Sequence, residues 1–229
     1  MKNVLLSTAY LGPVQYYTKL YAAPTVYLER HDHYVKQTYR NRCLIAGPAG
    51  VQALTIPIEH ATGPKTAACD VRISDHGDWR HLHWAALVSA YEGSPFFEYF
   101  ADGFHALYRR RFTFLVDFND ALQELVCSWL GLFPRIVRTR QYVDDLPPAT
   151  LDLRDAIRPK RPAGADPTFC PAPYWQVFAG RHGFLPNLSI VDLLFNMGLE
   201  ARLVLRASIV DAEASAEMSD AGGQSVIRG

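Results

Sequence analysis

The chain has 229 residues, of which 49% are hydrophobic and 20% are charged, and its 23 basic side chains balance 23 acidic ones. This composition is typical of a globular protein with a sizeable apolar core. The balanced charge argues against a protein held to nucleic acid or to an anionic membrane by bulk electrostatics. No stretch approaches the roughly 20 apolar residues that cross a bilayer. The four cysteines form no C-x-x-C pair, so we expect a cytoplasmic protein without disulfides or structural zinc.

The first part of the chain predicts a βαβ unit followed by a hairpin. The β-prone start is too short for the apolar core of a signal peptide, and Gly12-Pro13 follows it and opens a helix. Gly47-Pro48-Ala49-Gly50 is a turn signal between two apolar runs. Strands are expected at residues 3–9, 25–28, 43–46, 51–58 and 70–73, with a helix at 14–21.

The middle and the end of the chain change to helical periodicity. The clearest amphipathic pattern places Phe118, Leu122 and either Leu125 or Val126 on one face of a helix that stops at Gly131. Another helix has Trp79, Leu82, Ala86 and Ala90 at helical spacing. Helices are expected at 75–92, 95–111, 114–131 and 190–197. Ser94 caps the second of them and Asn187 or Ser189 caps the last. Short strands are expected at 135–139 and 203–205.

These elements predict one α/β domain over residues 1–205. It would have a short mixed sheet opened by the βαβ unit, and a cluster of central amphipathic helices. Residues 147–172 are rich in proline and read as a loop, partly disordered. Residues 206–229 are small and polar and read as a disordered tail.

Several blocks resemble the WbqC-like protein family, and its Bacteroidetes-type branch most of all. The blocks are LLSTAYLGPVQYYTKL at 5–20, KQTYRNRCLIAG at 36–47, DWRHLHWAALVSAYEGSPFFEYF at 78–100, LVDFNDALQELVCSWLGL at 115–132 and LPNLSIVDLLFNMG at 185–198. They occur in the family's order over about 200 residues. Many members carry a His-Gln-Pro type motif after the first strand, whereas this chain has Leu6-Ser7-Thr8-Ala9, so that histidine's role is not transferred.

The resemblance implies a role in bacterial surface-polysaccharide (O-antigen) synthesis. The expected activity is transfer of a glycosyl, acyl or aminoacyl group, with a small-molecule activated sugar or acyl donor as the partner. The alternative is a non-catalytic binding or assembly protein of the same pathway, with the aromatic segment 96–100 as its contact surface. The sequence names no cofactor and no metal site, and the usual nucleotide-binding and hydrolase motifs are missing.

The segment after residue 35 is the first candidate site. Lys36, Tyr39, Arg40, Asn41 and Arg42 combine cations with hydrogen-bonding side chains, which can bind a phosphate or a carboxylate. The Lys-x-x-x-x-Asn-Arg spacing also matches the family. The alternative is that the arginines pair with acidic neighbours such as Glu29, Asp32 or Asp70.

The second candidate is His83, which matches a His-Trp pair of the family and would act as a general acid or base. Tyr91 lies eight residues later on nearly the same helix face, so it is expected to share the pocket. The alternative for His83 is a hydrogen-bonded core residue. Six further polar residues stay open between a structural and a functional role: His31, His33, Asp117, Asn119, Asp192 and Asn196.

Overall fold

The computed structural model describes residues 1–59, 65–161 and 165–210. Its elements follow in chain order: β1 (Asn3–Ser7), α1 (Val14–Ala22), β2 (Val26–Glu29), β3 (Arg42–Gly47), β4 (Gly50–Thr55), α2 (Trp79–Tyr91), α3 (Phe97–Arg109), α4 (Leu115–Trp129), β5 (Ile136–Arg138), β6 (Thr150–Asp152), α5 (Ala179–His182), α6 (Ile190–Met197) and α7 (Ala201–Ala207). The α/β class and the opening βαβ unit are confirmed. Among these helices, none is long and apolar enough to cross a membrane.

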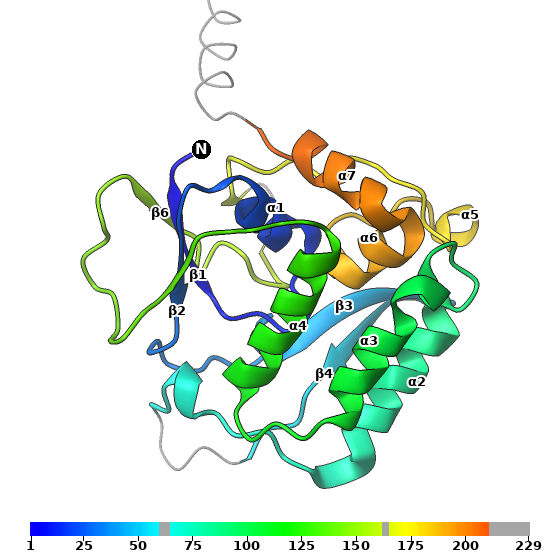
Figure 1. Ribbon diagram of the computed structural model, residues 1–229, viewed down its shortest axis with the longest axis horizontal. Helices are drawn as coiled ribbons and strands as arrows, with labels where there is room; N and C mark the ends of the chain where they lie inside the picture. Colours follow the sequence, from blue (N-terminus) through cyan, green and yellow to red (C-terminus); the bar gives the residue numbers. More distant parts are fainter. Residues whose placement is uncertain (60–64, 162–164, 211–229) are drawn as a thin grey trace, which may run out of the picture.

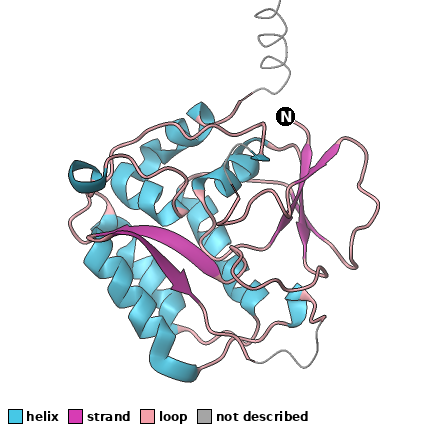
Figure 2. Ribbon diagram, turned by 180° about the vertical axis from the view of Figure 1, so that it is seen from behind, coloured by secondary structure: helices cyan, strands magenta, loops and turns pink. Residues whose placement is uncertain are grey.

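The strands form two separate sheets, not the one mixed sheet that the sequence predicted. Strands β5, β2, β1 and β6 make a four-stranded parallel sheet in that order, and β3 and β4 make an antiparallel hairpin. The two sheets lie apart (Figures 1 and 2). Strand β3 of the hairpin contacts the helices α2 and α6. Val4, Leu5 and Leu6 of β1 are all buried, because both faces of a parallel sheet are covered.

The order of the parallel strands reverses at β1. The chain goes from β1 through α1 to β2 on one side, and it returns from β5 to β6 on the other side of β1. Because parallel strands end at the same edge, the carboxyl ends of β1 and β6 lie side by side there, with Leu153 N donating to Leu5 O at 2.9 Å. Ligands of open α/β sheets bind at such an edge, where the strand order reverses.

The helices bury one shared apolar core. Phe118, Leu122 and Val126 lie on its side of α4, as their spacing predicted. Helix α6 begins where expected, with Ser189 Oγ accepting from Val191 N, and it ends at Gly198, whose φ is +56°. Only glycine adopts that backbone conformation without strain.

Other local predictions were wrong. Leu82 is 60% exposed, and His83 occupies the buried face of α2 in its place. Residues 203–205 belong to helix α7. Of the predicted strand at 70–73, Asp70 ends a 3-10 helix, and Arg72 and Ile73 make isolated bridges. Helix α3 begins at Phe97, two residues after the predicted start, and Ser94 Oγ donates to Tyr91 O instead of capping it.

The proline-rich segment contributes to the fold. Strand β6 lies inside it and pairs with β1. The predicted tail begins too early, because Ser208 is buried and its hydroxyl accepts from Ala172 N at 3.0 Å. Residues 211–229, the rest of that tail, lie outside the described part of the chain.

Candidate functional site

A cavity of about 430 Å³ opens at the carboxyl edge of the parallel sheet. We call it the edge pocket. The loop after β2 forms one side of it, and the segment after β6 forms the other, so it lies at the point where the strand order reverses. Ten residues line it: His31, Asp32, His33, Val35, Arg40, Tyr142, Asp152, Arg154, Asp155 and Arg158.

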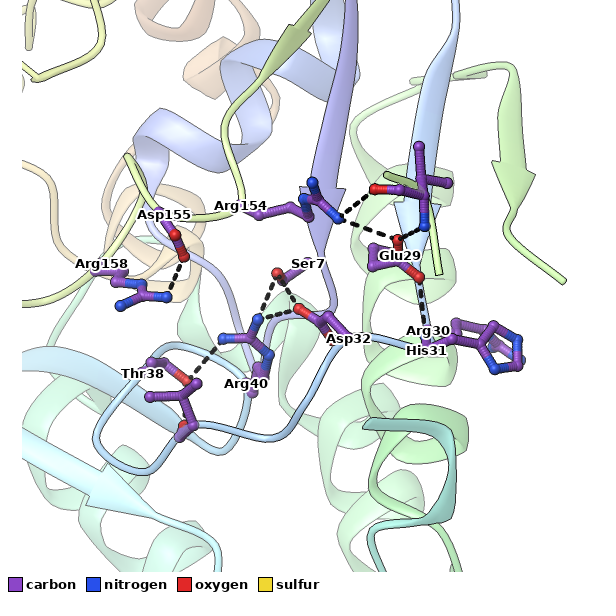
Figure 3. Close-up of polar contacts among 12 residues, drawn as sticks. Ser7, Glu29, Arg30, His31, Asp32, Thr38, Arg40, Arg154, Asp155 and Arg158 are labelled. Carbon is purple, nitrogen blue, oxygen red and sulfur yellow. Dashed lines mark hydrogen bonds and ion pairs between the residues drawn. The ribbon is translucent and has the colours of Figure 1, made fainter. Parts of the chain in front are cut away.

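Arg40 forms the inner wall of the edge pocket and is fixed by three neighbours (Figure 3). Its Nη2 donates to Ser7 Oγ at 2.8 Å and pairs with Asp32 Oδ2, and its Nη1 donates to Thr38 Oγ1 at 3.3 Å. Ser7 Oγ also donates to Asp32 at 3.0 Å. The side chains of Arg40 and Asp32 are only 3% and 9% exposed. A buried pair of this kind is costly to break, because the remaining charge has no partner.

Arg154 is fixed in the same way on the other side. Its Nη2 pairs with Asp152 at 2.7 Å. Its Nη1 donates to Glu29 Oε2 at 3.3 Å (Figure 3). Burial acts to raise the pKa of Asp152, but the hydrogen bonds from Arg154 outweigh it and keep this pKa below its ordinary value. Glu29 is fully buried at the end of β2 and also accepts from Thr139 and Val143. Glu29 therefore anchors Arg154 and the 139–143 segment to the sheet.

The outer rim of the edge pocket carries less constrained groups. Arg158 pairs through Nη2 with Asp155, whose side chain is 73% exposed. His31 and His33 line the same pocket, and His33 is exposed. Tyr142 is 46% exposed, and the Arg154 guanidinium lies 5.0 Å from the centre of its ring. The rim thus offers hydrogen-bond donors, acceptors and imidazoles, the side chains that most often move protons near neutral pH.

The structure places the five residues of the predicted anion-binding segment in different surroundings. Of its five residues, only Arg40 lines the edge pocket. Tyr39 is buried and lines a smaller cavity behind Arg40, and Asn41 Nδ2 donates to Ile56 O at 2.8 Å. Lys36 is exposed on the loop, and Arg42 lies on β3, where its Nε donates to Thr55 Oγ1. The alternative interpretation holds for Arg40, which pairs with Asp32, while the pocket beside it keeps a binding role open.

His83 and Tyr91 are not part of the edge pocket, of the smaller cavity behind Arg40 or of a groove beside α4. His83 Nδ1 is 2.9 Å from Tyr10 OH, and burial lowers the pKa of this imidazole to about 4. Tyr91 OH donates to Asp192 at 2.9 Å and accepts from Ala46 N. The two residues therefore have different hydrogen-bond partners, and their catalytic role stays a prediction.

The other open residues take mostly structural positions. Asn119 donates to Thr8 Oγ1 and to Arg40 O, so it supports the loop that carries Arg40. Asp192 is buried and also accepts from Tyr174 and Gln176. Asn196 Nδ2 donates back to Asp192 O. Asp117 is exposed and lines a shallow groove beside α4.

Sequence reasoning missed Ser7, Arg154 and Arg158. The last two lie in the proline-rich segment, where a three-residue strand leaves no periodic signal. The sequence signal that could have identified these two arginines is their spacing of four residues, each directly after an apolar residue. Within the described ranges, no group of three histidines, cysteines or acids is placed to hold a metal ion.

Comparisons with known proteins identify the family of the chain. The WbqC-like protein family matches residues 8–156, a range that includes Asp32, Arg40 and Arg154. The curated "Uncharacterized protein Rv1507c" of Mycobacterium tuberculosis is 27% identical over 245 residues, which cover 90% of this chain and 98% of that protein. No solved structure matches the chain. The chain belongs to the WbqC-like protein family.

Proposed function

We propose that this chain is a transferase of bacterial surface-polysaccharide (O-antigen) biosynthesis that binds an activated sugar or acyl donor in the edge pocket. The observation that carries the proposal is the position of a cavity of about 430 Å³ at the carboxyl edge, where the strand order reverses. The pathway in this proposal is the one that the resemblance to the WbqC-like family implies.

The pocket supports a division of roles among its residues. Arg40 and Arg154 are fixed by buried partners, so they preserve its shape and polarity. Arg158 is 28% exposed and is the arginine best placed to contact a phosphate or carboxylate of the donor. His31 and His33 line the same space and are the proton-transfer candidates there.

The alternative of an assembly protein gains little from the aromatic segment 96–100. Phe97 and Phe100 are buried in the core, while Tyr99 is 75% exposed and Phe96 is 38% exposed. Phe96 packs against Gly198, where an added Cβ would lie 2.7 Å from its ring. Most of the segment therefore serves packing.

A thermal-shift panel tests the proposal directly. The purified protein is screened against nucleotide sugars, coenzyme A thioesters, an aminoacyl-adenylate analogue and free nucleotides. A ligand at about 100 times its Kd stabilises a protein by about 2.7 kcal/mol, which is an easily measured increase in Tm. We expect at least one donor to raise the Tm of the wild type, and Arg158→Gln to lose most of that shift.

The matched control is Arg109→Gln. Arg109 is an exposed arginine at the end of α3 and is not part of the pocket wall. This variant should keep the full shift. A panel in which no donor changes the Tm, or in which both variants bind as well as the wild type, contradicts the proposal.

A further inference from the structure

The wall of the edge pocket carries paired charges. Each arginine that lines it contacts an aspartate that also lines it, and the buried Glu29 adds a fourth carboxylate behind Arg154. The pairs are Arg40 with Asp32, Arg154 with Asp152, and Arg158 with Asp155. Three arginines against four carboxylates leave no excess of positive charge in this part of the structure. Such a wall recognises a ligand by hydrogen bonds more than by net charge.

The rim offers donors and acceptors next to each other. Arg158 Nη2 donates to Asp155 Oδ1, and this is the one hydrogen bond between the two side chains. The Nη1 group of this arginine and the second oxygen of this aspartate are therefore available to a ligand. A hydroxyl group both donates and accepts, so neighbouring hydroxyls can bind an aspartate and an arginine together.

The inner end of the pocket has unsatisfied polar atoms. Asp32 Oδ1 and Arg40 Nε are buried and have no hydrogen-bond partner among the described residues. Both side chains are more than nine-tenths buried. A cavity of about 10 Å³ lies beside Arg40 and is also lined by Ser7 and Arg154. That volume fits about one water molecule or one hydroxyl group, so a small polar group suits this end and an alkyl chain does not.

Few of the residues that line the edge pocket are apolar. Val35 and Tyr142 are the only members of the ten-residue lining that are not charged residues or histidines. An acyl chain or a pantetheine arm requires a longer apolar surface to release water. A single half-exposed aromatic ring, fixed from one direction by Arg154, suits the C–H face of a pyranose.

We infer that the edge pocket binds the hexose of an activated sugar. Asp155 and the side chains next to it would bind the hydroxyls of the hexose, and Tyr142 would pack against the sugar ring. The inference rests on the proposed function and selects the sugar over the acyl or aminoacyl donor. Arg158 then faces the phosphate that joins the sugar to its leaving group. Specificity resides in the carboxylates, whereas the previously expected cations Lys36 and Arg42 lie outside the lining.

Isothermal titration calorimetry with matched probes tests the inference. UDP-glucose, UDP-galactose and UDP-N-acetylglucosamine are compared with UDP alone and with acetyl coenzyme A. At least one UDP-hexose should bind about tenfold more tightly than UDP, the size of one charge-assisted hydrogen bond. Asp155→Asn should remove that gain and leave the affinity for UDP unchanged, and Arg109→Gln should change neither.

The other outcomes separate the inference from the function it rests on. UDP and all the UDP-hexoses binding equally, or Asp155→Asn keeping the full gain, overturns the sugar assignment. Acetyl coenzyme A binding in an Arg158-dependent way, without any gain from a hexose, overturns the sugar assignment but supports the transferase. Failure of every probe and of the whole thermal-shift panel overturns the proposed function itself. Circular dichroism of each variant confirms that it is folded.

Discussion

Two buried polar networks of this molecule invite comparison, because both contain residues expected to act in chemistry. One lies at the carboxyl edge of the parallel sheet, where Arg40, Asp32 and Arg154 form the wall of a cavity of about 430 Å³. The other lies between the hairpin and the helices, where His83 bonds to Tyr10 and Tyr10 bonds to Tyr108. The second network contributes no residue to the edge pocket. Burial and hydrogen bonding occur in both networks, and contact with the edge pocket distinguishes them.

The electrostatics of the two networks also differ. The edge network consists of charged groups that neutralise each other, so it depends on complete pairs. The helix-side network consists of uncharged groups, and burial raises the pKa of Tyr10 and Tyr108 and lowers that of His83. Each network should therefore respond to a different perturbation.

The largest effect is expected from Arg40→Ala. This change leaves the Asp32 carboxylate buried without its partner, which costs about 3–5 kcal/mol of the free energy of unfolding. Urea denaturation at pH 7 measures the loss. The double variant Arg40→Met with Asp32→Leu removes both charges and should recover at least half of it. A loss below about 1 kcal/mol for the single variant would show that the pair is not buried in solution.

This prediction also determines which variants can test binding. A loss of ligand affinity in Arg40→Ala would not separate a contact to the ligand from a damaged fold. Arg158 and Asp155 lie at the rim and are partly exposed, so their variants keep the buried pairs intact. They are the sharper probes of the edge pocket.

A smaller effect is expected from acid titration of the helix-side network. Burial lowers the pKa of folded His83 to about 4 from an ordinary value of 6.5. Between these values the unfolded chain binds a proton that the folded chain does not, so stability falls as pH falls from 6.5 to 4. The full difference is about 3 kcal/mol, and it is absent above pH 6.5.

Comparison with His83→Gln isolates this contribution from that of the carboxylates. Urea denaturation of both proteins at intervals from pH 7.5 to pH 4 gives two stability curves. The wild-type curve should fall more steeply below pH 6.5 than the variant curve. Parallel curves over the whole range would mean that His83 titrates in the folded state as it does in the unfolded state.

The contrast between the networks explains what the sequence could predict. Local signals located the βαβ unit, the hairpin turn at 47–50, helix α4 and the cap of α6, because periodicity and turn chemistry act over a few residues. They could not locate β6, whose three residues pair with β1 from about 145 positions away. The edge pocket depends on that pairing, so Arg154 and Arg158 were out of reach while Arg40 was not. The burial of His83 in place of Leu82 depends on the rotation of α2, which tertiary packing decides.

The smallest effect is expected from Arg42→Gln, although Arg42 is only two residues from Arg40. Residues two apart share a face only within a strand, and Arg40 lies before β3 while Arg42 begins it, so their spacing does not bring the two side chains together. Arg42 makes one exposed hydrogen bond, from Nε to Thr55 Oγ1 at 2.9 Å. Its replacement should change stability by less than about 0.5 kcal/mol and leave donor binding in the edge pocket unchanged. Denaturation and calorimetry on the same preparation measure both quantities. A tenfold loss of affinity with unchanged stability would show that Arg42 binds the donor and that the anion lies on the hairpin side of the loop. An unchanged affinity would leave Arg40 as the one residue of the predicted segment that contributes to the pocket.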